Sequence, residues 1–386
     1  MAGLSERFFN SLPVRRLSTD DPLHLLDRQE IRQLRLIQNT VMAIAAAFSV
    51  LGFLAYYLPI YFYPQWFPAA QVSLPFRNAP LRLAWGEFLW GIALALLELW
   101  ALVFLNLASV HEIAVTTEYL NADNKPEKGE SLVKIGLEIR SPDVRRYGID
   151  PFQGMNKWLL FLFNLVFRLK GWLGNRVIRF LTRLLLGRYA LRAVLDFVGM
   201  PLYMAINAYA VYTVMREAKV IILGQTAVGL LLQRLPEVAL SSAEQGLLYD
   251  TLQYIAISKR DYHGNHYLLT KGLLDHFHIP PKPYHRLSED YLDKVQGAAP
   301  GVQALCRLVI LLGFILDGHL SWRERWELRR LNERRVLPEG DREVKRRLRD
   351  FVNGAGISAW SDAYVAQLAA PVTAQVEEDG RLGSGR

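Results

Sequence analysis

Apolar and polar positions separate along this chain into long runs of each kind. Two apolar runs, 37–63 and 83–110, are long enough to cross a bilayer, because a helix of about 20 residues suffices. Residues 36–76 carry no charged side chain, and aromatic residues gather at the far end of the first run, as at a membrane–water interface. The pattern therefore predicts a transmembrane hairpin over 37–110.

A second pair of apolar runs, 197–215 and 220–235, is separated only by the segment from Arg216 to Lys219. This segment contains good helix formers and no Gly, Pro or Asn that would make a turn. We therefore expect one long helix, apolar all round and buried in a bundle, that ends before Pro236. Two additional spans are the alternative.

From residue 240 onward the hydrophobic period is helical. Ser241 with Glu244, and Ser321 with Glu324, have the spacing of capping boxes, and a core helix is expected over 301–316. The polar segment before these helices differs, because 121–131 has the composition of a loop and 132–141 alternates as a strand would.

The fold class is thus mainly all-α: a polytopic helical membrane protein with interfacial amphipathic helices and a cytoplasmic helical bundle. The expected order is a cytoplasmic N-terminal segment (1–36), the transmembrane hairpin (37–110), a polar connecting segment (111–156), basic amphipathic membrane-interface helices (157–195), the long buried helix or extra spans (196–239), a cytoplasmic helical domain (240–365) and a disordered tail (366–386).

Composition and charge narrow the class of protein further. The chain has 45 Lys+Arg against 37 Asp+Glu and a single cysteine, which excludes a disulfide-stapled secreted domain. Arginine is frequent before the first span, and basic residues are frequent again after the second. By the positive-inside rule both termini are expected in the cytoplasm.

One stretch between residues 151 and 195 contains basic residues and no acidic residue. These basic residues are Lys157, Arg168, Lys170, Arg176, Arg179, Arg183, Arg188 and Arg192. They alternate with Trp, Phe and Leu, which predicts helices that lie on anionic membrane lipids. The alternative is a bundle helix with a solvated basic face. Nucleic acid is not expected as a partner, because no recognition motif accompanies the charge.

Two carboxylates interrupt the second apolar run. Glu87 and Glu98 are eleven residues apart and share one helical face, with Glu98 near the middle of the span. A carboxylate in the bilayer predicts an ion path in a homo-oligomeric channel or transporter, or a protonated group hydrogen-bonded at an oligomer interface. Asn207 is a candidate partner.

Histidines are dense in a later segment. The candidate metal ligands are His263, His266, His276 and His278, with Asp261 and Asp275 among them. Imidazole and carboxylate ligands suit a transition metal such as Zn²⁺, the one cofactor that the sequence suggests. The alternative is a surface loop rich in His and Tyr, sensitive to pH.

The segment LCRLVILLGFILDGHLSWRERWELRRLNER (305–334) resembles the TerB-like helical domain. Asp317-Gly318 stands at its turn, and Ser321 and Glu324 open its charged helix. The resemblance implies an interaction or regulatory module connected with bacterial stress responses at the inner face of the membrane. It also implies that Asp317 and Glu324 could hold a cation, although Arg323 and Arg325 beside Glu324 argue against one.

The whole chain also resembles two-span bacterial membrane proteins that are known only as families without a function. Together these features favour a non-enzymatic sensing or scaffolding protein that contacts anionic lipids, with an oligomeric channel or transporter as the alternative. A metal-dependent enzyme or metal sensor is the third hypothesis. The sequence does not identify a protein partner.

Overall fold

The computed structural model describes residues 2–14, 26–68, 70–72, 81–83, 85–121, 124–137, 144–153, 189–260 and 262–369. Helices dominate these residues, so the expected all-α class is confirmed. The chain divides into two compact units. Unit 1 comprises 1–18, 28–140 and 156–219, and unit 2 comprises 19–27, 141–155 and 220–386.

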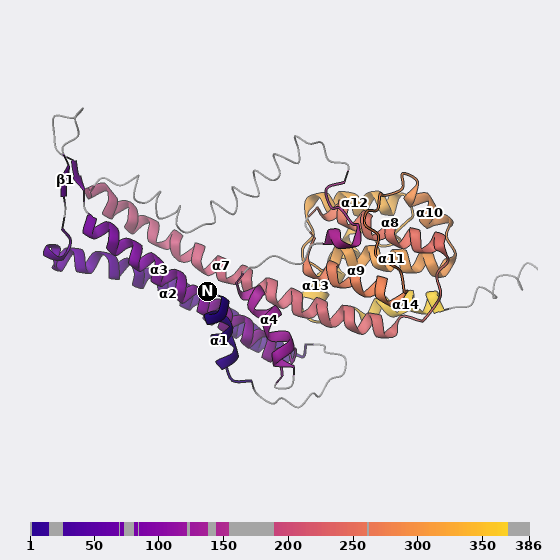
Figure 1. Ribbon diagram of the computed structural model, residues 1–386, viewed down its shortest axis with the longest axis horizontal. Helices are drawn as coiled ribbons and strands as arrows, with labels where there is room; N and C mark the ends of the chain where they lie inside the picture. Colours follow the sequence, from indigo (N-terminus) through magenta and orange to yellow (C-terminus); the bar gives the residue numbers. More distant parts are fainter. Residues whose placement is uncertain are drawn as a thin grey trace, which may run out of the picture. The chain divides into compact units, whose positions relative to one another are not determined.

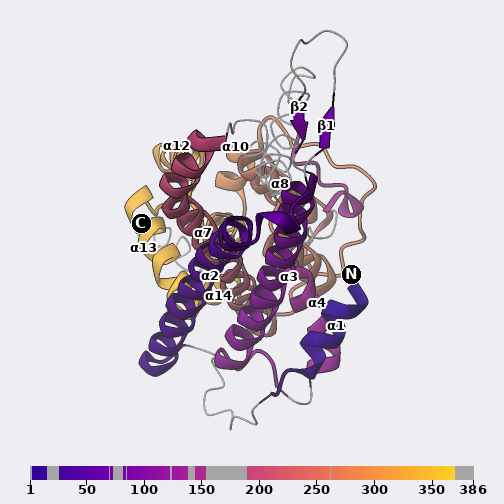
Figure 2. The ribbon, with the colours of Figure 1, turned by 90° about the vertical axis from the view of Figure 1, so that its left-hand side faces the viewer.

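Unit 1 is built on two long apolar helices, α2 (Arg28–Phe62) and α3 (Trp85–Thr116), which lie side by side in both views (Figures 1 and 2). Between them lie a 3-10 turn, η1 (Pro64–Trp66), and the antiparallel strands β1 (Ala70–Val72) and β2 (Leu81–Leu83). Trp90 of α3 donates a hydrogen bond to the backbone oxygen of Ala55 in α2, at 3.0 Å. The predicted hairpin of two apolar helices is therefore present. Each helix is longer than expected at one end, because α2 begins at Arg28 and α3 ends at Thr116.

Two short helices pack on one end of this hairpin, α1 (Ala2–Ser11) and α4 (Lys125–Gly136). The ring of Phe8 in α1 meets that of Phe104 in α3 edge to face, with centroids 4.7 Å apart. Lys125 Nζ donates hydrogen bonds to the backbone oxygens of Asn10 and Leu12. The residue pattern did not predict α1, which is a helix of only 10 residues.

The loop and strand expected over 121–141 are wrong where α4 lies. Gly129, Leu132, Val133 and Gly136 are buried, and their spacing of three and four residues is that of a helix face. Pro126 stands in the first turn of the helix, where its missing N–H is not needed. The short run after residue 131 fits both the two-residue period of a strand and the period of a helix. Packing against α3 favours the helix.

α7 (Tyr189–Arg234) is one continuous helix of 46 residues, so Arg216 to Lys219 lie within a helix and not in a turn. Its part before Val220 belongs to unit 1, where it buries a stripe that includes Asn207, Val211 and Ala218. The expectation that it is buried on all sides is wrong there, because Leu202 and Tyr209 are exposed.

The contacts of α7 show its direction in unit 1. Asn207 contacts Ser49 of α2, and the charge of Arg35, also in α2, acts on Lys219. Because the residue numbers increase along α7 as they decrease along α2, the two helices run antiparallel.

Unit 2 is a helical bundle around one central helix (Figure 1). Its helices are the last part of α7, α8 (Ser242–Lys259), α9 (Gly264–His276), α10 (Tyr291–Gly297), α11 (Pro300–Ile315), α12 (Trp322–Glu333), α13 (Asp341–Val352) and α14 (Ser358–Ala369), with the short η2 (Val144–Tyr147) beside them. Every residue of α11 from Leu308 to Ile315 is buried, which confirms it as the core helix that the sequence predicts.

Both predicted capping boxes are present. Ser241 caps α8 with Glu244, and Ser321 caps α12 with Glu324. The predicted disordered tail begins too early, because α14 continues to Ala369 and Leu368 is buried next to Gly301 of α11. Residues 370–386 lie outside the described part of the chain.

Candidate functional site

A polar cluster joins the three apolar helices of unit 1. The side-chain amide of Asn207 in α7 donates hydrogen bonds to Glu98 Oε1 in α3, at 2.6 Å, and to Ser49 Oγ in α2, at 2.8 Å. An asparagine amide has two N–H donors, and both are used here. The structure thus brings together Glu98 and Asn207, two of the three residues considered for an ion path.

The surroundings of the cluster are small or apolar. A Cβ atom added at Gly52 would lie 3.9 Å from Glu98 Oε2, so the glycine leaves room beside the carboxylate. Ala45, one turn before Ser49, and Val211, one turn after Asn207, are buried. Such a cluster can hold helices together by hydrogen bonds, or it can carry a proton on the carboxylate.

Glu87, the third of these candidates, does not join the cluster. Eleven residues separate it from Glu98, which corresponds to about 16 Å along the helix axis. Glu87 lies in the first turn of α3, where a carboxylate complements the positive end of the helix dipole. The two carboxylates share a helix face but cannot share one proton or ion.

The basic stretch cannot be assessed in the same way. Its residues from Lys157 to Arg188 lie outside the described part of the chain, and Arg192 lies in α7. The prediction that these residues bind lipid remains a prediction.

The predicted metal ligands have separate roles in unit 2. His263 caps α9, because its Nδ1 accepts a hydrogen bond from the backbone N–H of Asn265 at 3.1 Å. His266 Nε2 lies 2.9 Å from the backbone oxygen of Gly313, and His276 Nε2 lies 3.2 Å from that of Pro236. Each of these rings thus meets the backbone of a helix or loop.

Within the described residues, no group of three or more His, Cys, Asp or Glu side chains is placed to hold a metal ion. His278 and Asp275 belong to no such group, and Asp261 lies outside the described residues. Burial lowers the pKa of His266 to about 3, so this ring is neutral at physiological pH. These residues are close in sequence, but those that the structure describes do not converge in a group of three or more.

A buried lysine lies between the two acidic positions that the TerB-like resemblance singles out. Lys259 Nζ is 2.8 Å from Asp317 Oδ2 and 3.2 Å from Glu324 Oε2, and the lysine side chain is 1% exposed. Its ammonium group also donates to the backbone oxygen of His319. The cation between these carboxylates is therefore the chain's own ammonium group.

The lysine determines the electrostatics of this cluster. Burial would raise the pKa of Asp317, but the charge of Lys259 and its hydrogen bonds outweigh burial and lower that pKa. Sequence reasoning missed Lys259, the last residue of α8, because nothing in its sequence neighbourhood distinguishes it from a solvated helix-end lysine.

A second buried carboxylate, Asp250 of α8, holds the loop that precedes α10. Its oxygens accept hydrogen bonds from Ser288 Oγ at 2.6 Å and from the backbone N–H of Ser288, and they lie 2.8 Å from His285 Nε2. Ser288 faces the carboxylate and not the imidazole, so the three groups do not form the relay of a hydrolase. Their role is to fix the loop.

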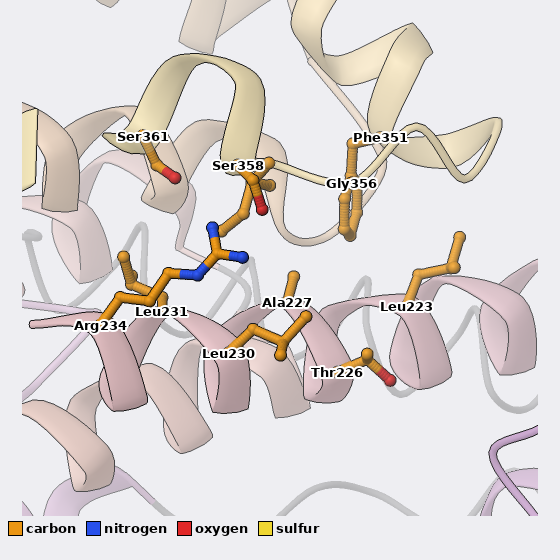
Figure 3. A pocket seen from close by; sticks show the side chains of 11 residues that line it. Leu223, Thr226, Ala227, Leu230, Leu231, Arg234, Phe351, Gly356, Ser358 and Ser361 are labelled. Carbon is orange, nitrogen blue, oxygen red and sulfur yellow. The ribbon is translucent and has the colours of Figure 1, made fainter. Parts of the chain in front are cut away.

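A small hollow lies between α7 and the start of α14 (Figure 3). Its free volume is ≈ 20 Å³, which is room for about one water molecule. Arg234 reaches across it from α7 and pairs with Asp362 at 3.0 Å. This hollow is too small for a substrate.

Compared with family models, curated proteins and solved structures, the chain matches none of them. The likeness to the TerB-like domain therefore remains a prediction from the residues of 305–334.

Proposed function

We propose that the protein is a membrane-anchored sensing or scaffolding protein that presents unit 2 at the cytoplasmic face of a bacterial inner membrane. One observation carries the anchoring. The most apolar stretches of α2 and α3 meet the length and hydropathy of a membrane span, yet only 17% and 11% of them are buried. A core helix of a soluble protein would bury most of that surface. Large exposed side chains on these helices include Leu51, Leu54, Leu58, Leu89, Leu96 and Leu97.

The first part of α7 accompanies these helices in the membrane. It meets α2 and α3 at the cluster of Ser49, Glu98 and Asn207, and it exposes Leu202 and Tyr209 on its other side. With the N-terminus in the cytoplasm, α2 leads outward, so the antiparallel α7 starts at the outer end. α7 then leads back toward the cytoplasmic side, and both termini remain inside.

The proposed lipid contact belongs to the basic stretch from Lys157 to Arg192. Its lack of acidic residues and its Trp, Phe and Leu content support contact with anionic headgroups. The TerB-like residues of unit 2 support a stress-related interaction module, and the ammonium of Lys259 makes a bound cation unnecessary there.

Lipid preference in nanodiscs tests the lipid contact. The full chain is inserted into discs of phosphatidylcholine and phosphatidylglycerol, and the lipid composition of purified discs is compared with that of empty discs. We expect phosphatidylglycerol to be enriched, and the enrichment to fall between about 50 mM and 500 mM salt, because screening weakens exposed charge contacts. The combined variant Arg176→Gln, Arg179→Gln, Arg183→Gln should reduce the enrichment.

A matched control exists in α13. Arg342, Lys345 and Arg349 have the same spacing as the three arginines above and are exposed in unit 2. Their replacement by glutamine should leave the enrichment unchanged. An equal loss of phosphatidylglycerol enrichment in both variants would contradict the assignment of lipid contact to the basic stretch. So would an enrichment that does not change with salt concentration.

A second candidate function is proton or ion conduction in a homo-oligomer. The hydrogen-bonded carboxylate of Glu98 among three apolar helices is the observation that favours it. Flux into proteoliposomes that is abolished by Glu98→Gln would support conduction. Unchanged flux, or none in the parent chain, would leave the cluster as a contact between helices.

A further inference from the structure

A hollow of ≈ 320 Å³ lies in unit 2 between α8, α10, α12 and the loop that Asp250 fixes. Its walls are largely apolar and aromatic, formed by Tyr254, Ile257, Leu287, Tyr291, Leu292 and Trp326. Three arginines, Arg323, Arg330 and Arg334, complete the lining from α12 and its C-terminal cap. An apolar hollow with a few charged groups on one side is the usual form of a small-molecule site.

The arginines lie along one side of α12. Their spacing of seven and four residues returns to the same helix face. Within the described residues neither Arg323 nor Arg334 forms an ion pair, and Arg330 lies 3.5 Å from Glu327. Two of the three guanidinium groups thus have no carboxylate partner in the described part of the chain.

The carboxylates of the lining cancel this charge only in part. The lining contains two carboxylates, Glu289 and Glu327, against three guanidinium groups, and Glu327 also accepts a hydrogen bond from the Tyr254 hydroxyl at 2.5 Å. The positive charge of this side of α12 also affects Arg260. Burial first, and then the charge of Arg323, lower the pKa of the Arg260 guanidinium.

The aromatic part of the hollow is accessible. Trp326 is 53% exposed, and Trp322, one turn earlier on α12, is 76% exposed. Tyr254 and Tyr291 pack behind them with ring centroids 5.2 Å apart. An indole at the rim of an apolar hollow offers a flat surface on which a ring can stack.

We propose that this hollow binds a small soluble molecule in which an oxyanion, a phosphate or carboxylate, is joined to a flat apolar group. The guanidinium forks of α12 match the geometry of such an oxyanion, and the apolar walls with Trp326 take the remainder. The site lies wholly within unit 2 and does not depend on the proposed membrane anchoring. A ligand bound in this hollow would be the signal that the proposed sensing protein recognises.

Calorimetric titration of the full chain in phosphatidylcholine nanodiscs tests the site. The probes are 1-naphthyl phosphate, inorganic phosphate and 1-naphthol, which separate the oxyanion from the apolar group. We expect 1-naphthyl phosphate to bind at least about tenfold more tightly than either single-feature probe, which corresponds to about 1.4 kcal/mol. The variants Arg330→Gln with Arg334→Gln, and Trp326→Ala, should each weaken it about tenfold or more.

The exposed pair Arg342→Gln with Arg349→Gln removes the same charge from α13 and should leave the affinity unchanged. Thermal unfolding of every variant shows whether the bundle is intact. No binding of 1-naphthyl phosphate, or equal binding by the parent chain and the α12 variants, overturns the proposal. So does a tenfold loss of affinity in discs that contain phosphatidylglycerol, because a lipid headgroup would then occupy the hollow.

Discussion

At the scale of the residue, Lys259 is the most informative side chain in unit 2. Replacing it by Met removes the ammonium and leaves Asp317 and Glu324 buried without their cation. Breaking a buried ion pair in this way costs about 3–5 kcal/mol, so we expect a large fall in the unfolding midpoint of unit 2. Chemical denaturation monitored by circular dichroism measures the loss.

The exposed pair of Lys294 and Asp290 provides the control for this prediction. Its side chains are 50% and 61% exposed, and such pairs contribute less than about 1 kcal/mol. Lys294→Met should therefore change little. A Lys259→Met variant as stable as Lys294→Met would show that the two buried carboxylates tolerate the loss of their cation.

The buried carboxylate of Asp250 should make the stability of unit 2 depend on pH. Burial would raise its pKa, but hydrogen bonds from His285 and Ser288 outweigh burial and lower the pKa in the folded state. A carboxylate with a lowered folded pKa stabilises the fold above its unfolded pKa, and this contribution is lost as pH falls through the folded value. We expect the unfolding midpoint to decrease as the pH is lowered below about 4. In Asp250→Asn this decrease of the midpoint with pH should be less steep. Parallel pH profiles for the two proteins would contradict this role.

At the scale of the element, two glycines of α7 make a matched pair. A Cβ at Gly224 would lie 1.9 Å from Asn265 Nδ2, whose amide donates to the backbone oxygens of Val220 and Leu316. Gly224→Ala should therefore displace a buried hydrogen-bonding side chain and destabilise unit 2 by about 1–3 kcal/mol. Nothing lies within 4 Å of a Cβ at Gly229, so Gly229→Ala should stabilise the helix by up to about 1 kcal/mol.

Thermal unfolding of the two variants measures the difference. The order Gly229→Ala, parent, Gly224→Ala from most to least stable is expected. Equal midpoints would mean that α9 and α7 do not approach closely at Asn265.

The elements that the sequence predicts well are those with strong local signals. Caps at Ser241 and Ser321 and the unbroken apolar run of α11 are local properties, and they are present as expected. α4 was missed because its short alternating run fits two periods, and only contact with α3 decides between them. The described members of the predicted metal site do not form a metal-binding group for a related reason: the sequence shows that histidines are close along the chain, but not where their rings point.

The candidate site shows the same limit. A carboxylate at residue 98 inside an apolar run is visible in the sequence, and so is an amide at residue 207. Their contact depends on the packing of α7 against both α2 and α3, which no spacing encodes. The hollow beside α12 depends on four elements of unit 2 and leaves no local pattern except the arginine spacing.

At the scale of the whole molecule, the central claim is that α2 and α3 span a bilayer, with unit 2 in the cytoplasm. The chain is well suited to cysteine labelling, because its single cysteine, Cys306, is fully buried and burial raises its thiol pKa to about 11. A buried thiol of high pKa reacts slowly with maleimides. Labelling of the parent chain, which contains only Cys306, therefore measures the background.

The decisive measurement is labelling of Gln71→Cys, Ala190→Cys and Glu333→Cys, one at a time, by a membrane-impermeant maleimide in intact spheroplasts. We predict that residues 71 and 190 are labelled from outside, because they lie at the outer end of the hairpin and at the start of α7. Residue 333 of unit 2 should be labelled only after permeabilisation. Labelling of residue 333 together with residue 71 in intact spheroplasts, or a protein recovered in the soluble fraction, would contradict the account.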